Sequence, residues 1–328
     1  MNKEILYSVI TPVYNREDSI MRCLESVEHA MANLNGQGGG NVEHIVVDDG
    51  SSDHTAQLVE DYARCHERVR FFQFGSNRGT NAARNKAISE ARGKWCIFLD
   101  SDDYFVDEAL QTISDTMQSQ PEYRHYMFAP DDMQPYYQSN AILQGAQQKV
   151  LLYPDFLNGY VGGDFIHVCN TEILRRHLFD EKLRIHEGVF FLMFFREARQ
   201  MLFTNKVVTI RERNRADSVT RESFRTSLAV INRTIIANEL RLREFEADYV
   251  RLGMARQLRN LRLSLLDNYL LAGRYKDANG MIRLLGAART SKYRVLKIIC
   301  AFRMGWLYRH MLMLLLFVKY KVMKKRID

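Results

Sequence analysis

The sequence predicts an α/β fold, with a Rossmann-like, mainly parallel sheet flanked by helices and an all-helical C-terminal extension. Two observations lead to this prediction. Short β-rich runs alternate strictly with segments of helical period over the first hundred residues, and no strand candidate occurs after about Arg221. Strict alternation indicates right-handed crossovers between parallel strands, and such sheets bind ligands at the carboxyl ends of their strands.

The first expected strand, residues 5–11, is followed by a helix whose apolar residues recur at helical spacing from Ile20 to Leu34. Asp18 or Ser19 is placed to cap this helix, and Pro12 is placed to end the strand before it. Residues 35–41 form a glycine-rich loop. The other elements expected in this part are strands at 42–49, 68–74 and 94–100 and helices at 55–66 and 81–92.

The pattern weakens from about Ser119 to Val161, where we expect a long connection around a binding cleft with one strand in it. Short strands and helices then return, beginning with FIHVCN, whose His167 and Cys169 are expected in the core. Because the sequence after about Arg221 has a helical pattern, we place a domain boundary near residues 217–222.

The composition is that of a globular protein, with 46% apolar and 26% charged residues among 328. Five scattered cysteines without CxxC or Cys/His spacing argue against a disulfide framework or a zinc site and favour a reducing, cytoplasmic setting. The N-terminus reads as a first strand rather than as a secretory signal, so we do not expect export.

The positive charge is concentrated in the C-terminal tail. Ten of the 46 Lys and Arg residues, but one of the 39 Asp and Glu residues, lie between Ser291 and Asp328, which leaves 36 basic and 38 acidic side chains before them. A nucleic-acid partner is therefore not expected. The apolar run 311–318 is too short to span a bilayer, but its aromatic and basic flanks suit a helix lying on an anionic membrane. A helix packed on the main domain is the alternative.

Acidic residues follow two of the expected strands. Asp48 and Asp49 come after one, and Asp100, Asp102 and Asp103 come after another. Because parallel strands bring their carboxyl ends to one edge, both clusters are expected to face a common cleft. Crowded carboxylates repel each other unless a cation intervenes, and oxygen ligands select Mg²⁺, Mn²⁺ or Ca²⁺. Asp53 is better explained as a helix cap.

Four strings occur in an order that resembles the family 2 glycosyltransferases, which are inverting enzymes of the GT-A fold. These are SVITPVYN, VVDDGSSDHT, NRGTNAARNKAISEARGKW and FLDSDD, and they cover about the first 105 residues. The resemblance implies a GT-A catalytic domain at 1–218, with a nucleotide-sugar half at about 1–105 and an acceptor half at about 106–218. A helical region at 219–328 follows, with a membrane-associating tail at 291–328.

By this resemblance, the turn after the first strand lines the nucleotide pocket with Thr11, Pro12, Tyr14 and Asn15. Asp49 is implied to read the base, because a carboxylate accepts a bond from a ring N–H such as that of uracil, and Asp48 is a weaker companion. Arg78 and Arg84 are implied to approach the donor phosphates or to position the acidic loop. For Arg84, a structural ion pair with that loop is an equal alternative.

The DSDD string contains the family's DxD motif, here Asp100-Ser101-Asp102. The resemblance implies that Asp102 binds the divalent cation, Mn²⁺ or Mg²⁺, that bridges the diphosphate. It implies that Asp100 meets the ribose or a metal-bound water, with Ser101 beside it on the donor side. Asp103 is expected to cap a helix that begins near Asp107 or to support the site through a hydrogen bond.

An inverting transfer needs a base that takes the proton from the acceptor hydroxyl. In relatives the base lies in an acidic Glu-Asp pair, and here Glu187 aligns with the first acid while Gly188 replaces the second. Glu187 is the expected base, with His186 and Asp164 as rivals, although a glutamate at a helix start is often only a cap. Farther along, Arg213, Arg215 and Ser218 are expected to donate to phosphate or to form a solvated basic turn.

The resemblance implies a metal-dependent inverting glycosyltransferase, with hexosyl or N-acetylhexosaminyl transfer from a nucleotide sugar, most simply a UDP-sugar. The acceptor is expected to be a saccharide or lipid-linked saccharide in surface polysaccharide or lipopolysaccharide synthesis, reached from the inner face of the cell membrane. A homodimer is left open. The alternatives are a non-catalytic nucleotide-sugar-binding protein, which Gly188 favours, and a related nucleotidyltransferase, which the string TPVYNRED disfavours.

Overall fold

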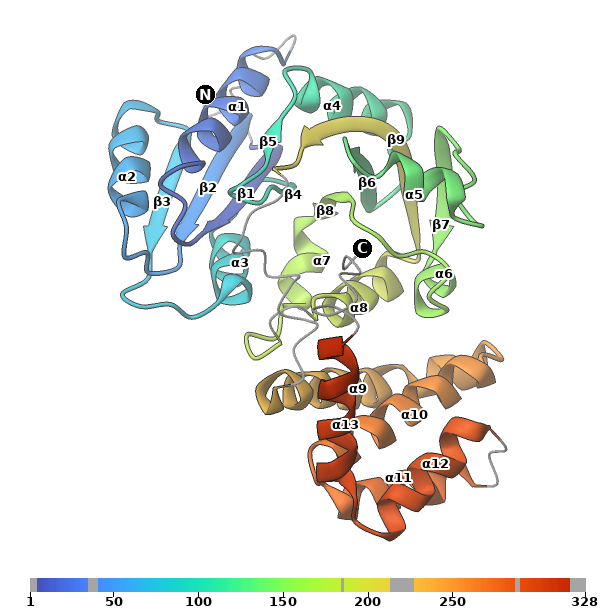
Figure 1. Ribbon diagram of the computed structural model, residues 1–328. Helices are drawn as coiled ribbons and strands as arrows, with labels where there is room; N and C mark the ends of the chain where they lie inside the picture. The colour runs from blue at the N-terminus through green and yellow to red at the C-terminus, as the bar shows by residue number, and fades with distance from the viewer. Residues whose placement is uncertain (1–4, 35–40, 184–185, 213–226, 287–289, 319–328) are drawn as a thin grey trace. The chain divides into compact units, whose positions relative to one another are not determined.

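The computed structural model describes residues 5–34, 41–183, 186–212, 227–286 and 290–318. The chain divides into two compact units, Met1–Arg215 and Ala216–Asp328. The first unit contains every described strand together with helices α1 to α8 (Figure 1), and the second contains helices only.

The described strands of the N-terminal unit form one sheet in the order β3-β2-β1-β4-β8-β6-β9-β5, with β7 paired to β9. The strands are β1 (Tyr7–Val13), β2 (Val42–Asp48), β3 (Val69–Gln73), β4 (Trp95–Phe98), β5 (Tyr104–Phe105), β6 (His125–Pro130), β7 (Gln148–Leu152), β8 (Ile166–Asn170) and β9 (Gln200–Ile210). The helices are α1 (Ile20–Ala32), α2 (Thr55–Cys65), α3 (Thr80–Glu90), α4 (Ala109–Ser119), α5 (Gln134–Ser139), α6 (Tyr153–Leu157), α7 (Thr171–Arg176) and α8 (Gly188–Ala198).

The predicted α/β fold is confirmed, and the sheet is parallel through its first four strands in space. β1 pairs in parallel with both β2 and β4, and β2 pairs in parallel with β3. Beyond β4 the sheet becomes mixed, because β8 runs antiparallel to both β4 and β6. The alternation of strand and helix that predicts parallel pairing ends at β4, so the expectation of a mainly parallel sheet holds for that half.

The weakly patterned stretch between about 119 and 161 contains more structure than the single strand expected there. It holds β6, α5, β7 and α6. The sequence pattern does not predict β7, because only Leu151 of its five residues is buried and no alternation of apolar and polar residues results. Two smaller expectations also change, since β1 continues one residue past Pro12, and the Ser19 side chain makes no capping bond within the described chain.

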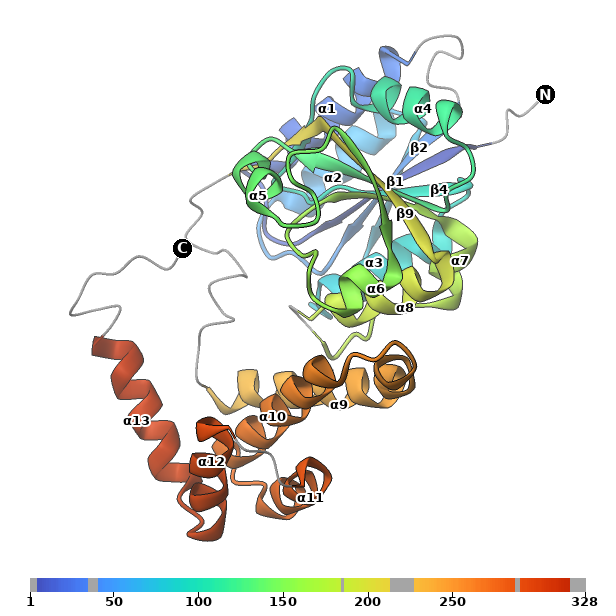
Figure 2. The ribbon, with the colours of Figure 1, turned by 90° about the vertical axis from the view of Figure 1, so that its right-hand side faces the viewer.

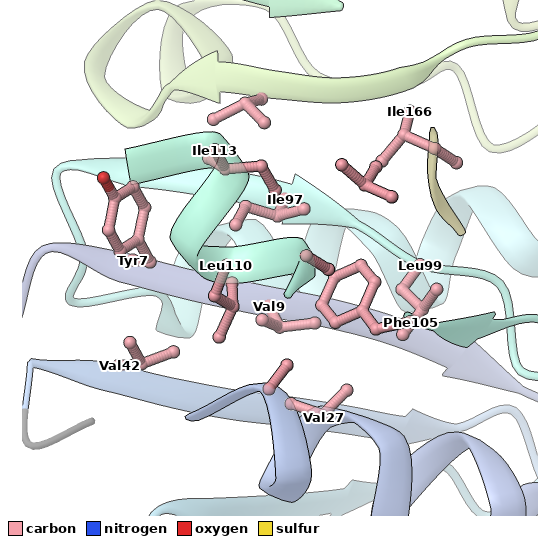
Figure 3. Packing of buried hydrophobic residues seen from close by; sticks show 14 of the residues in the cluster. Tyr7, Val9, Val27, Val42, Ile97, Leu99, Phe105, Leu110, Ile113 and Ile166 are labelled. Atoms are coloured by element: carbon pink, nitrogen blue, oxygen red, sulfur yellow. The ribbon is translucent and has the colours of Figure 1, made fainter. Parts of the chain in front are cut away.

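Helices cover both faces of the sheet, with α1 and α4 on one side and α3, α7 and α8 on the other (Figure 2). The apolar stripe of α1, including Val27, packs with Leu110 and Ile113 of α4 against strand residues such as Val9 and Ile97 (Figure 3). Burying these side chains supplies the main stabilisation of the unit. The rigid sheet in turn fixes where its strands end.

The C-terminal unit is built from α9 (Leu228–Arg251), α10 (Ala255–Leu271), α11 (Tyr275–Leu285), α12 (Ser291–Ala301) and α13 (Gly305–Phe317). Its core includes Ile235 of α9, Leu266 of α10, Met281 of α11 and Leu296 of α12. Of the helices that the structure describes, none is both long enough and apolar enough to cross a bilayer.

Two fully buried histidines predict how the stability of the protein depends on pH. Burial lowers the pKa of His44 to about 3 and that of His125 well below its usual value. Each stays neutral in the folded chain but takes up a proton in the unfolded chain below about pH 6.5. We therefore expect the free energy of unfolding to fall by about 1.4 kcal/mol per pH unit per histidine as the pH drops below that value.

Urea unfolding at pH 7.5 and pH 5.5 measures this loss. The variant His44→Gln should show a shallower dependence on pH than the wild type. His29→Gln, which changes an exposed histidine of α1, serves as the matched control and should not alter the dependence. Equal pH dependence in wild type and His44→Gln would contradict the assignment.

Candidate functional site

The carboxyl ends of three neighbouring strands meet at one edge of the sheet. β1 lies between β2 and β4 and is parallel to both, so the residues that follow each strand lie at the same edge. The two acidic clusters of the sequence, at Asp48 and Asp49 and at Asp100 to Asp103, therefore belong to one region, as expected. This edge is the candidate site.

Asp48 and Asp49 both organise backbone at the end of β2. Asp48 accepts hydrogen bonds from the Ser51 amide at 3.0 Å and from the Ser51 hydroxyl. Asp49 is 3% exposed and accepts from the amides of Arg78 at 2.7 Å and Gly79 at 2.8 Å. Asp49 thus ties the start of α3 to β2.

The turn after β1 is held against β2. Asn15, whose φ is +50°, donates its amide to the Ser51 hydroxyl at 2.9 Å and accepts from the Ser52 amide at 2.8 Å. Tyr14 is 41% exposed beside it. Thr11 differs from expectation, because its hydroxyl is fully buried and bonds the ring of His44 at 2.9 Å.

Pro12 is also buried, within β1 and opposite Val47. The side chains of Thr11 and Pro12 therefore do not reach the surface of the edge. We leave both out of the ligand contacts proposed below, whereas Tyr14 and Asn15 remain.

Two guanidinium groups flank the acidic loop that follows β4. Arg84 of α3 pairs with Asp100 at 3.0 Å, and Arg16 of the β1 turn approaches Asp102 at 3.7 Å. Both arginines are largely buried, with side chains 16% and 15% exposed. Ser101 between the two acids is buried, and its carbonyl accepts from Ser19. The loop is therefore neutralised by the protein's own cations.

Asp103 is stabilised differently from its neighbours. Burial, together with the charges of Asp100 and Asp102, raises the pKa of Asp103 to about 8. Its carboxyl accepts from the Glu212 amide at 3.3 Å, just after β9. The expectation that Asp103 caps a helix is wrong, because α4 begins at Ala109 and Glu108 occupies its N-cap position. The alternative expectation, a supporting hydrogen bond, describes what Asp103 does.

Glu187 occupies the N-cap position of α8, but in the described chain its side chain makes no capping bond. Its carboxylate lies 3.5 Å from the second guanidinium nitrogen of Arg84, and the side chain is 27% exposed. Arg84 therefore contacts Asp100 with one nitrogen and Glu187 with the other. A Cβ placed on the neighbouring Gly188 would meet no atom within 4 Å among the residues described.

Asp164 is held by a second cluster of charges. Arg211, at the end of β9, makes a two-bond pair with Asp132 and reaches Asp164 at 2.6 Å. The Asp131 carboxylate accepts from the Arg211 amide at 3.1 Å. These contacts give Asp164 a structural partner, whereas His186 lies directly beside Glu187 in sequence.

The structure describes Arg78 but not the other expected phosphate donors. Arg78 is half exposed, pairs with Glu181 at 3.2 Å and lies over the ring of Phe74. Its backbone amide is the group that Asp49 holds. Arg213, Arg215 and Ser218 lie outside the residues that the structure describes.

The donor set of the β4 loop suits a divalent cation that shares its coordination shell with a substrate. Within the described ranges, no three or more His, Cys, Asp or Glu side chains are arranged to hold a metal ion. Asp100 and Asp102 nevertheless offer exposed or half-buried carboxylate oxygens. One or two carboxylates completed by substrate phosphates is a common arrangement for Mg²⁺. These residues therefore fit such an ion in the presence of a phosphate ligand.

Arg16 and Arg211 are two residues of this edge that the sequence reasoning missed. Arg16 lies in an irregular turn, and Arg211 stands at the end of a strand whose partners come from distant segments. One signal for Arg16 was available, since it directly follows the first strand's turn and so lies at the ligand-binding edge of a parallel sheet.

Comparison with known proteins identifies a family and several relatives. The sequence profile of glycosyl transferase family 2 matches residues 8–171. The GalNAc(5)-diNAcBac-PP-undecaprenol beta-1,3-glucosyltransferase of Campylobacter jejuni is 26% identical over 251 residues, which cover 74% of this chain and 77% of that protein. The minor teichoic acid biosynthesis protein GgaA of Bacillus subtilis is 26% identical over 231 residues, covering 67% of this chain and half of that protein.

Solved structures share the fold at low sequence identity. S. aureus TarS 1–349 in complex with UDP-GlcNAc superposes with a TM-score of 0.60 at 17% identity, over 92% of each chain. A mannosyltransferase from Pyrobaculum calidifontis in complex with GDP-Man and Mn²⁺ gives a TM-score of 0.54 at 15% identity, over 93% of this chain and 86% of that one. These likenesses establish the GT-A fold.

The contacts of Asp49 predict that it stabilises the protein whether or not it contacts a ligand. Asp49→Asn leaves one oxygen acceptor and turns an amide N–H₂ toward a backbone N–H. We expect the free energy of unfolding to fall by about 1–3 kcal/mol, as urea unfolding will show. Asp61→Asn, on the exposed side of α2, is the control and should change it by less than about 0.5 kcal/mol. A fully stable Asp49→Asn protein would mean that these two hydrogen bonds contribute little.

Proposed function

Since this chain is a member of glycosyl transferase family 2, we propose that it transfers a sugar, with inversion, from a nucleotide-diphosphate sugar to a saccharide or lipid-linked saccharide hydroxyl. The observation that carries the proposal is the position of Arg84, which contacts both Asp100 of the β4 loop and Glu187 at the start of α8. One guanidinium thus links the proposed donor site to the proposed base. We assign the transfer to residues 1–218.

A UDP-sugar is the proposed donor. Tyr14 and Asn15 offer an exposed ring and polar groups beside the end of β2. Asp49 at this end is proposed to accept a hydrogen bond from a ring N–H of the base. Solved relatives of the same fold hold UDP-GlcNAc or GDP-Man. Arg78, Arg84 and Arg16 are the described cations at this edge that we propose for the diphosphate. Arg213 and Arg215, outside the described residues, stay predictions.

Asp102, with Asp100 beside it, is proposed to hold Mn²⁺ or Mg²⁺. When bound, such an ion would neutralise charge that develops on the departing nucleoside diphosphate. Before the ion arrives, Arg16 and Arg84 neutralise these two acids, and the raised pKa of Asp103 keeps its carboxyl largely uncharged at neutral pH. The loop can therefore stay folded in the free enzyme.

Glu187 is proposed to accept the proton of the attacking hydroxyl. Its side chain is free of a capping bond in the described chain and faces Arg84, which supports a role other than helix capping. Asp164 is the weaker candidate because Arg211 holds it at 2.6 Å, a closer ion pair than the 3.5 Å contact between Arg84 and Glu187.

Gly188 favours a second candidate function, which is non-catalytic binding of a nucleotide sugar. The family resemblance implies a second acid at this position, where this chain has glycine. The two functions differ in one measurable respect, because a binding protein takes up the donor without turning it over.

Surface polysaccharide assembly is the proposed context. One relative's name specifies an undecaprenol-linked substrate and another's specifies teichoic acid biosynthesis. We propose a lipid-linked acceptor and action at the inner face of the cell membrane.

Replacing the proposed base predicts a loss of transfer without a loss of donor binding. Glu187→Gln keeps the size of the side chain but cannot accept the proton, so turnover should fall at least about 100-fold. The affinity for UDP, measured by calorimetry, should stay within about twofold, because Asp49 and the β4 loop are unchanged.

Glu172→Gln is the matched control, since Glu172 also lies at a helix N-terminus but on α7. It should leave turnover unchanged. Undiminished turnover in Glu187→Gln would remove Glu187 from the mechanism, and Asp164→Asn and His186→Gln would then test the rivals. A wild-type protein that binds UDP-sugars without consuming them would favour the binding function.

The proposed metal site predicts a metal-dependent thermal shift. UDP should raise the melting temperature of the wild type more strongly with Mn²⁺ than without it, because binding to the folded state stabilises it. Asp102→Asn should lose the metal-dependent part of the shift. Asp107→Asn, at an exposed position beyond the loop, should keep it. An equal shift with and without Mn²⁺ in the wild type would argue for a donor site that uses only the arginines.

A further inference from the structure

The outward side of α12 and α13 carries a series of exposed apolar side chains. On the inner side, Tyr293 and Leu296 pack into the core of the helical unit. On the outer side, large apolar residues recur at helical spacing. This surface, called the α12–α13 face, comprises Val295, Ile298, Phe302, Trp306, Leu307, Met311, Leu314 and Leu315. Single exposed apolar residues are ordinary, but a series of eight marks an interaction surface.

The corner between the two helices is clamped to the body of the unit. The Tyr275 hydroxyl donates to the Arg303 carbonyl at 2.7 Å and accepts from the Gly305 amide at 3.0 Å. A Cβ at Gly305 would lie 2.1 Å from the Leu270 carbonyl oxygen, so only glycine permits this approach. Farther along α13, Tyr308 donates to Asp267 at 2.9 Å.

These contacts fix the corner where α12 meets α13 (Figure 2), and Phe302 at the end of α12 and Trp306 at the start of α13 belong to this corner. Phe302 is 73% exposed and Trp306 is 65% exposed. The face is therefore a preformed surface that spans two helices. It does not depend on the apolar run at 311–318 alone, as the sequence had suggested.

The charge of this segment indicates what covers the face. Residues 291–318 contain no Asp or Glu but five basic residues, which are Lys292, Arg294, Lys297, Arg303 and Arg309. Lys292 pairs with Asp267 of α10. A second copy of the chain docked face to face would bring the same cations together, which costs free energy. Anionic lipid headgroups offer the opposite charge beside an apolar layer.

We propose that the α12–α13 face docks on an anionic phospholipid bilayer. Phe302 and Trp306 enter the interfacial layer, and Arg294, Lys297, Arg303 and Arg309 contact lipid phosphates. Aromatic rings prefer this depth, and long basic side chains reach from it to the headgroups. Docking would bring the transferase proposed above to a lipid-borne acceptor, but the docking itself does not depend on transfer activity.

Vesicle binding by the full chain tests the proposal. The wild type should sediment with vesicles of equal parts phosphatidylglycerol and phosphatidylcholine, and far less with phosphatidylcholine alone or in 0.5 M salt. The double variant Phe302→Ser and Trp306→Ser should bind at least about tenfold more weakly, because two large apolar side chains no longer leave water. The matched control, Val250→Ser and Leu284→Ser, changes two exposed apolar residues of α9 and α11 and should bind like the wild type.

Fluorescence gives a second measurement that needs no variant. The chain has two tryptophans, of which Trp95 is buried and Trp306 is exposed. Vesicles that take up Trp306 should shift the emission to shorter wavelength and protect it from a water-soluble quencher. Circular dichroism will show whether the serine variants keep their helices.

Three outcomes would overturn the proposal. These are no binding to anionic vesicles, equal binding by the Phe302 and Trp306 double variant, and concentration-dependent self-association that this variant abolishes, which would identify a second copy as the occupant. Failure of the proposed function would look different, because it would appear as missing donor turnover in a protein that still binds vesicles.

Discussion

The need to neutralise three carboxylates at the end of β4 governs the arrangement of the candidate site. A buried strand ends in Asp100, Asp102 and Asp103, and unpaired charges at such a position are costly. Arg84 pairs with the first and Arg16 approaches the second, whereas Asp103 is held by a backbone amide and has a raised pKa. Each partner comes from a different element, so the acids draw together the β1 turn, α3 and the end of β9.

Much of this site follows from the sequence, because acids at the ends of adjacent parallel strands must meet at one edge. The ion pair of Arg84 with Asp100 of the acidic loop was one of the two alternatives expected for this arginine. Arg16 could not be predicted with the same ease, since a turn has no period that says where its side chains point. Asp49 accepts two hydrogen bonds from backbone amides that lie 29 and 30 positions later in the chain. Only the folded structure brings these groups together.

The second half of the sheet was harder to predict for a related reason. Pattern analysis depends on burial that alternates or repeats, and β7 leaves four of its five side chains exposed at an edge of the sheet. β9 is difficult for a different reason. It pairs with β5, β6 and β7, which come from distant parts of the chain, and the sequence pattern does not predict these pairings. Thr11 illustrates the same limit within β1. Every residue of this strand is buried, and the sequence alone does not tell that the Thr11 hydroxyl bonds the His44 ring.

Position 188 shows that a departure from a family pattern can be chemical without being steric. The space around the Gly188 Cβ position is open among the described residues, and α8 starts there with ordinary helical geometry. A Cβ at this position would meet none of the described residues. One substitution therefore separates this chain from the acidic pair that the family resemblance implies. The backbone at the start of α8 has room for the Cβ of the second acid.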